Sequence, residues 1–257
     1  MSLTENQIER AASLLLNAYR EQRQIEALPA ELEPGCVEDA YAIQDRVAGE
    51  LSSGRVRAWK TGAPNPETTP YGAPIFDQAV LESPALIAAE QLHMIGVEVE
   101  LCYRLGRDLP ARDEPYSDEE VAAAIAGVQV AVEVVDTRLR QWQECAELWK
   151  LADNQINAAL VMGSGTDDWR GLDPSRLTGQ LVVNGVLQVE GRGCHSVGDP
   201  FRLLPWMANH LTGRNGGLKQ GDLVTTGTWT GMVFVRPGDE IVGRFPGIGE
   251  ARVSFPV

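Results

Sequence analysis

The chain has 257 residues, of which 44% are hydrophobic and 23% charged, as in an ordinary globular protein. Its net charge of −14 repels nucleic-acid phosphates and anionic lipids, so both are poor partners. No apolar run is long enough for a membrane span, and the first residues carry no secretory pattern, so we expect a cytoplasmic protein. Four scattered cysteines without a Cys-x-x-Cys motif favour free thiols over disulfides or zinc.

Two helices are predicted before residue 54. Thr4 and Gln7 have the spacing of a capping box, and apolar residues follow at helical intervals as far as Tyr19. A second helix is predicted over residues 37–51. The pattern then changes, which indicates an N-terminal helical portion, residues 1–54, and a β-rich core with the candidate site, residues 55–257.

The predicted core consists mainly of strands with a few helices. A capping box at 117–120 indicates a helix that extends to about Gly127, and Asp199-Pro200 begins another that extends to Leu211. Asn184-Gly185 is typical of a hairpin turn within residues 177–192. The other extended or strand-like stretches are residues 55–62, 96–106, 128–139 and the short segments after Gly221. The expected fold class is therefore α+β.

Glu98 and Glu100 lie two residues apart in the alternating stretch 96–106. Side chains at this spacing project from the same face of a strand, so the two carboxylates lie together. A solvated face on an edge strand would explain such a pair without any function.

Glu133 is harder to explain in that way because Ala131 and Val135, its neighbours on the same face, are apolar. A buried carboxylate needs a partner, which could be Lys60 or Arg138, or else it could carry a proton. A cation shared with Glu98 and Glu100 is a further possibility. An all-oxygen ligand set favours Mg²⁺ or Mn²⁺, with Ca²⁺ behind them.

Several motifs, in this order, resemble the hydratase/decarboxylase branch of the fumarylacetoacetate hydrolase superfamily. They are VEDAYAIQ, GVEVELCYRLGRDLP, AVEVVDTRLRQW, ADNQINAALVMG, SVGDPFRLLPWMANHL and LKQGDLVTTGTWTG. The nearest likeness is to 2-oxopent-4-enoate hydratases and 4-oxalocrotonate decarboxylases. The resemblance implies a mixed β-sandwich or β-roll core, a Mg²⁺ or Mn²⁺ ion on Glu98, Glu100 and Glu133, and a homo-oligomer.

The resemblance also implies roles for five further residues. Lys60 matches a lysine beside the metal, Asp77 an active-site carboxylate, and Thr228 and Thr230 a segment that closes over the substrate. Asp153 could bind substrate, although a helix cap is the simpler reading of its sequence context. Two stretches that the resemblance places in the substrate pocket depart from the family pattern, residues 61–66 and Trp229.

Together with the resemblance, these residues predict a metal-dependent lyase. The resemblance implies that it hydrates a 2-hydroxydienoic or 2-oxo-enoic acid to a 4-hydroxy-2-oxo acid in aromatic catabolism. A 2-oxo acid decarboxylase is the main alternative, and a carbon–carbon hydrolase ranks third because no convincing His-Glu pair is present. A non-catalytic scaffold is a different class that the two departures keep open. The chain could also assemble with a decarboxylase or aldolase partner.

Overall fold

The computed structural model describes residues 2–257. The helices are α1 (Glu5–Glu21), α2 (Val37–Leu51), α3 (Asp118–Ala124), α4 (Glu147–Ala152) and α5 (Leu203–Thr212). Single 3-10 turns are η1 (Ala30–Leu32), η2 (Asp77–Ala79), η3 (Ala89–Gln91), η4 (Asn154–Ile156), η5 (Trp169–Gly171), η6 (Pro174–Arg176) and η7 (Pro200–Arg202). No helix in this range is long and apolar enough to cross a membrane.

The strands are β1 (Ala58–Gly62), β2 (Tyr71–Ile75), β3 (Val80–Glu82), β4 (Ala85–Leu86), β5 (Gly96–Leu105), β6 (Leu109–Pro110), β7 (Ile125–Val135), β8 (Asn157–Thr166), β9 (Thr178–Val183), β10 (Val186–Arg192), β11 (Gly217–Leu218), β12 (Leu223–Thr228), β13 (Val233–Phe234), β14 (Glu240–Phe245) and β15 (Gly249–Ser254).

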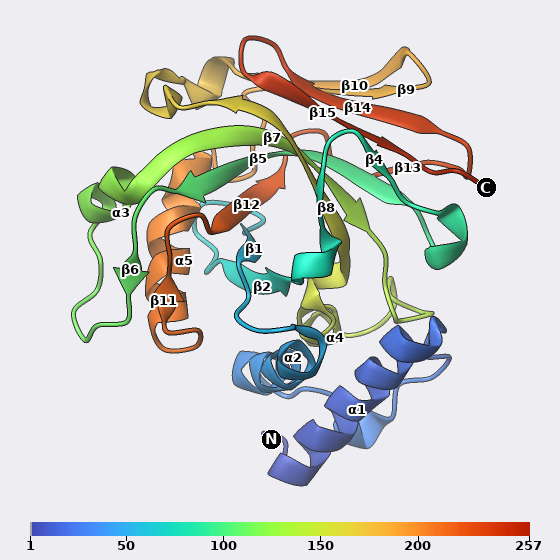
Figure 1. Cartoon of the computed structure of the whole chain (residues 1–257). Helices are drawn as coiled ribbons and strands as arrows, with labels where there is room; N and C mark the ends of the chain where they lie inside the picture. The colour runs from blue at the N-terminus through green and yellow to red at the C-terminus, as the bar shows by residue number, and fades with distance from the viewer. Residues whose placement is uncertain (1) are drawn as a thin grey trace.

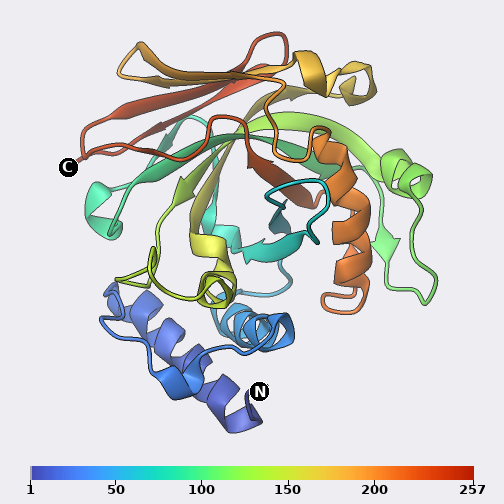
Figure 2. The ribbon, with the colours of Figure 1, turned by 180° about the vertical axis from the view of Figure 1, so that it is seen from behind.

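Two large sheets form the core. The larger has the order β2-β1-β12-β5-β7-β8-β3, with β13 on β5, and the smaller has the order β10-β9-β14-β15-β4. The larger sheet curls, so that β1 and β2 lie beneath the arch of β5 and β7, and the smaller sheet lies across the outside of that arch (Figure 1). Seen from behind, α5 runs beside the curl, and α1 and α2 lie at the end opposite the smaller sheet (Figure 2). This is the expected α+β fold with a curled, sandwich-like core.

Successive side chains of β5 alternate between two faces, an apolar outer face and an inner face that carries Glu98 and Glu100. Val97, Val99 and Leu101 are buried in the main core between the two sheets. The sheets approach closely at Gly243, where a Cβ atom would lie 2.8 Å from a methyl group of Val132. Because successive side chains of a strand point to opposite faces, the intervening residues of β5 project into the curl.

The predicted local signals are largely confirmed. Both capping boxes are present, on α1 and α3, and α2 has the predicted bounds. The hairpin turn at Asn184-Gly185 joins β9 and β10. The prediction for the helix after Ser117 was too long: it ends at Ala124 because Ile125 already pairs with Leu105 in the large sheet. The four cysteines are free thiols.

The N-terminal helices share their hydrophobic core with later parts of the chain. Leu15 of α1 and Ile43 of α2 belong to a second buried cluster that also contains Phe76, Leu139 and Trp149. The helices therefore rest on α4 and on the segment that precedes it. The division at residue 54 marks where strands begin to dominate, and as a domain boundary it stays a prediction.

A buried ion pair joins this second cluster to the end of β7. The Nε atom of Arg138 lies 2.6 Å from Oδ1 of Asp153, and the Arg138 side chain also donates to the backbone carbonyls of Asp153 and Asn157. The Arg138 guanidinium lies 4.3 Å from the ring centroid of Tyr19. Both charged side chains are almost completely buried, so each depends on the other.

We predict that Arg138→Met destabilises the protein by about 3–5 kcal/mol, because it leaves the buried Asp153 carboxylate without its counter-charge. Urea unfolding measures the change. Arg10→Ala is the control: Arg10 and Glu31 form an exposed pair, and its loss costs less than about 1 kcal/mol. Equal effects of the two substitutions would contradict the structural role given to Arg138.

Candidate metal centre

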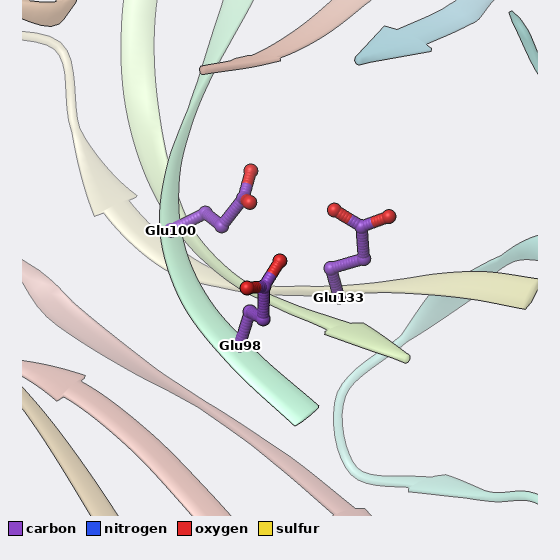
Figure 3. A group of neighbouring side chains, drawn as sticks. All are labelled: Glu98, Glu100 and Glu133. Carbon is purple, nitrogen blue, oxygen red and sulfur yellow. The ribbon is translucent and has the colours of Figure 1, made fainter. Parts of the chain in front are cut away.

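Glu98, Glu100 and Glu133 converge inside the curled sheet (Figure 3). Glu98 and Glu133 are directly opposite each other on the antiparallel strands β5 and β7. Each of the three residues offers a carboxylate oxygen, and these oxygens lie within 4.8 Å of one another. Glu100 and Glu133 are buried and Glu98 is half-buried. β5 and β7 are central strands of the larger sheet, so a solvated polar face on an edge strand does not explain these residues.

Glu133 pairs with Lys60 rather than with Arg138. The Lys60 ammonium group forms an ion pair with Oε1 of Glu133, and Nδ2 of Asn157 donates to the same oxygen at 2.9 Å. The second oxygen, Oε2, is buried and has no hydrogen-bond partner among the described residues. A buried carboxylate oxygen without a partner is costly, so this atom indicates a missing ligand.

Glu100 is oriented by β12. Oε2 of Glu100 accepts hydrogen bonds from the Thr225 hydroxyl and from the Gly227 backbone N–H, the latter at 3.0 Å. The register between β12 and β5 shifts between Thr225 and Thr228, and Gly227 has a φ of 96°. Such a bulge with a left-handed glycine turns an N–H out of the ladder. Both donors bind Oε2, which leaves Oε1 available as a ligand for a cation.

The three carboxylates are not balanced by protein charge. Burial, with repulsion from Glu133, raises the pKa of Glu98 to about 7, although Lys60 opposes the shift. Burial and the two neighbouring carboxylates also raise the pKa of Glu100 well above its usual range. Burial alone would lower the pKa of Lys60, but the carboxylates, Glu133 first, raise it overall. One ammonium group thus faces three carboxyl groups, and the oxygen-only site fits a divalent cation.

Lys60 is positioned by a strained turn as well as by β1. Its Nζ donates to the carbonyl of Gln155 at 3.1 Å. Asn154, Gln155 and Ile156 all have positive φ, between 51° and 54°. Consecutive non-glycine residues in this region carry backbone strain, which is typically found at functional sites. The backbone conformation of this turn directs the Gln155 carbonyl toward Lys60.

The structure places two of the other predicted residues near the triad. Thr228 lies opposite Glu100 across β12 and β5, and the Thr230 hydroxyl accepts a hydrogen bond from Val99 N at 3.2 Å. Both threonines are half-buried.

Asp77 and Asp153 do not join the group. Asp77 is exposed at the start of η2, beyond the end of β2. Asp153 is completely buried, and both of its oxygens are occupied: Oδ1 by Arg138, and Oδ2 by the Thr137 hydroxyl and the Arg138 backbone. The position of Asp153 therefore corresponds to a structural ion pair and not to the expected substrate ligand.

The two departures from the family pattern lie in different surroundings: Trp229 is in the core between the sheets, whereas residues 61–66 begin beside Lys60 in β1. Trp229 is buried between the sheets, 5.3 Å from Phe245 in an edge-to-face contact, so the expectation that it lines the substrate pocket was wrong. Of residues 61–66, the first three are buried and the last three are exposed. The Asn65 side chain caps the exposed turn by accepting from Glu67 N and Thr68 N. Despite both departures, Glu98, Glu100 and Glu133 still lie together, and Lys60 still pairs with Glu133.

Sequence reasoning missed Asn157, Thr225 and Gln155. All three lie within motifs that carry the family resemblance, so the signal was present. Their roles follow from β12 lying between β1 and β5 and from the left-handed turn before β8, and spacing along the chain does not reveal either feature.

Comparison with known families gives a match to the model described as "Fumarylacetoacetate (FAA) hydrolase C-terminal" over residues 48–255. The chain belongs to this family. A 2-keto-4-pentenoate hydratase of Paraburkholderia xenovorans is 30% identical over 266 residues, covering 98% of this chain and 96% of the relative. A 2-hydroxyhexa-2,4-dienoate hydratase of Comamonas testosteroni is 27% identical, with coverage of 96% and 97%.

Solved structures agree on the fold of this family member. The 4-oxalocrotonate decarboxylase of Pseudomonas putida G7, complexed with magnesium and adipate, superposes with a TM-score of 0.86 at 24% identity, over 99% of each chain. The same enzyme complexed with calcium and acetate gives a TM-score of 0.85 at 23% identity, again over 99% of each chain. The likeness extends through the N-terminal helices as well as the sheets.

We predict that Glu133→Gln lowers the affinity for Mg²⁺ by about 100-fold or more, because the amide removes the charge that the cation requires. Isothermal titration of the metal-free protein measures this. Glu190→Gln is the matched control, since Glu190 is exposed on β10 and should leave affinity unchanged. Retained affinity in Glu133→Gln would exclude Glu133 as a ligand.

Metal affinity should also depend on pH. Glu98, with a pKa of about 7, must lose its proton before it binds a cation, so Mg²⁺ affinity rises as the pH increases from about 5.5 to about 8. The stability of the metal-free protein should change in the opposite direction. The pKa of Glu98 in the folded protein exceeds the ordinary value of 4.5, so the free energy of unfolding decreases as the pH rises from 4.5 through about 7. Titrations across this range test both trends, and a pH-independent affinity would contradict the first.

Proposed function

We propose that the protein is a Mg²⁺- or Mn²⁺-dependent hydratase that acts on a short 2-hydroxydienoic acid and yields a 4-hydroxy-2-oxo acid. The observation that carries the proposal is the unpartnered Oε2 of Glu133 beside Glu98 and Glu100. The hydratase relatives, similar over nearly the whole chain, support the reaction type.

The bound ion would act as a Lewis acid that stabilises the negative oxygen of the substrate's enolate form. Glu98, Glu100 and Glu133 would hold it, with Asn157 and Thr225 fixing two of these carboxylates. The substrate's carboxylate and 2-oxygen would be the groups available to bind such an ion.

Lys60 is the group placed to move protons. Its ammonium lies among the carboxylates and is held by the Gln155 carbonyl. The 2-hydroxyl loses a proton, the far end of the diene gains one, and a conjugated 2-oxo-enoic acid results. The oxygen of water then bonds to C4, and its proton passes to C3. We leave Asp77 out of this path because it is exposed outside the group.

Decarboxylation is the second candidate because a 2-oxo-enedioic acid that loses its far carboxylate as carbon dioxide leaves the electron pair of the broken bond in the same kind of dienolate. The similarity to 4-oxalocrotonate decarboxylase concerns the fold and does not favour one reaction over the other. Thr228 and Thr230, at the edge of the site, are the proposed contacts with the substrate beyond the metal.

We also infer a cytoplasmic homo-oligomer, and a complex with a decarboxylase or aldolase is a further possibility for a hydratase of this kind. Exposed apolar side chains at strand edges, Leu86 on β4 and Phe234 on β13, support self-association.

The experiment follows the loss of absorbance of 2-hydroxypenta-2,4-dienoate with Mg²⁺ and with a chelator, and determines the product mass. We expect Mg²⁺-dependent turnover and a product that has gained one water. Lys60→Met should lower kcat by about 100-fold or more, whereas Lys219→Met, which alters an exposed lysine, should not. Loss of carbon dioxide from a 2-oxo-enedioic acid assayed in parallel, without hydration of the dienoate, would identify a decarboxylase. No turnover of either substrate would refute the proposal.

A further inference from the structure

Tyr71 lies beside Lys60 on the inner face of the curled sheet. It is the first residue of β2 and pairs with Gly62 of β1, whereas Lys60 pairs with Ala73. Lys60 and Gly62, two residues apart, project from the same face of β1. A Cβ atom on Gly62 would lie 2.7 Å from the Tyr71 hydroxyl oxygen, so the phenol covers this glycine on the side from which Lys60 projects.

The electrostatic environment of Tyr71 is that of the metal centre. Burial raises its pKa to about 12, with Lys60 opposing the shift and the carboxylates of Glu133, Glu100 and Glu98 adding to it. The phenol therefore keeps its proton at neutral pH and acts as a neutral hydrogen-bond donor. A neutral donor does not compete with the cation for the carboxylates.

The Tyr71 hydroxyl has no hydrogen-bond partner within residues 2–257, and the side chain is half-buried. Two other tyrosines use theirs within the fold: Tyr41 Oη accepts from Gly72 N at 3.2 Å, and Tyr116 Oη donates to the Pro110 carbonyl at 2.6 Å. Tyrosine hydroxyls in sheltered positions usually find a partner. The Tyr71 hydroxyl lies over Gly62, on the face of β1 from which Lys60 also projects.

We propose that the Tyr71 hydroxyl donates a hydrogen bond to a carboxylate or enolate oxygen of a 2-oxo acid bound at the metal centre. The identity of this ligand rests on the proposed function. Lys60 is engaged by Glu133 and Gln155, so Tyr71 supplies a donor that the resting protein has not committed. A neutral donor aimed at the position where negative charge develops stabilises the enolate.

Oxalate, a planar mimic of the enolate, is the probe. At saturating Mg²⁺, Tyr71→Phe should weaken oxalate binding by about tenfold or more, the loss expected for a hydrogen bond to a charged group. Mg²⁺ affinity without oxalate should stay within about twofold of wild type, because Tyr71 is not a metal ligand. Calorimetric titration measures both constants, and neither requires turnover.

Two further variants sharpen the test. Gly62→Ala displaces the hydroxyl through its new Cβ atom and should weaken oxalate binding in the same direction. Tyr116→Phe removes a phenol hydroxyl elsewhere and should leave both constants unchanged. Unchanged oxalate affinity in Tyr71→Phe would overturn the proposal, and so would a parallel loss of Mg²⁺ and oxalate affinity, since Tyr71 would then act through the metal site. If the wild-type protein binds Mg²⁺ and oxalate but turns over no dienoate, the hydratase function is refuted. The effect of Tyr71→Phe on oxalate affinity would still test the role of Tyr71.

Discussion

Three carboxyl groups share the inside of a curled sheet with a single ammonium group, and the rest of the site is organised around that imbalance. Buried charges are costly unless they are paired and hydrogen-bonded. Lys60 and Asn157 satisfy one oxygen of Glu133, while its other oxygen remains buried without a partner. Three clustered carboxyl groups with an unpartnered oxygen do not stabilise a fold, whereas a site that binds a divalent cation needs them.

The fold keeps this arrangement in place from both sides. On the outer face of β5 and β7, the valines pack against the smaller sheet and fix the register that puts Glu98 opposite Glu133. On the inner face, β1 and β12 bring Lys60 and Thr225 to the carboxylates. The costly features, the left-handed turn at Asn154–Ile156 and the bulge before Thr228, both lie next to the site. Strain concentrated in this way indicates function rather than packing.

Strand parity puts Glu98 and Glu100 on one face, and the apolar neighbours of Glu133 mark it as a buried carboxylate that needs a partner. The family resemblance implied that all three meet, and the structure brings them together. Parity also placed Val97, Val99 and Leu101 on the opposite face, as the structure shows. The partners of the carboxylates could not be predicted, because β12 lies more than a hundred residues after β5 in the chain and parity does not say which strands become neighbours. Family likeness alone was misleading for Trp229, which packs between the sheets. It also suggested a substrate contact for Asp153, whose ion pair with Arg138 only the fold reveals.

The most direct test of the metal centre is a crystal structure with Mn²⁺, located by its anomalous scattering. We expect one strong peak within about 2.5 Å of oxygens from Glu98, Glu100 and Glu133, with Oε2 of Glu133 among the ligands. We also expect the Lys60 ammonium to have moved away from Glu133. A peak elsewhere, or an empty site with the Lys60–Glu133 pair intact at saturating Mn²⁺, would contradict the assignment of these three residues.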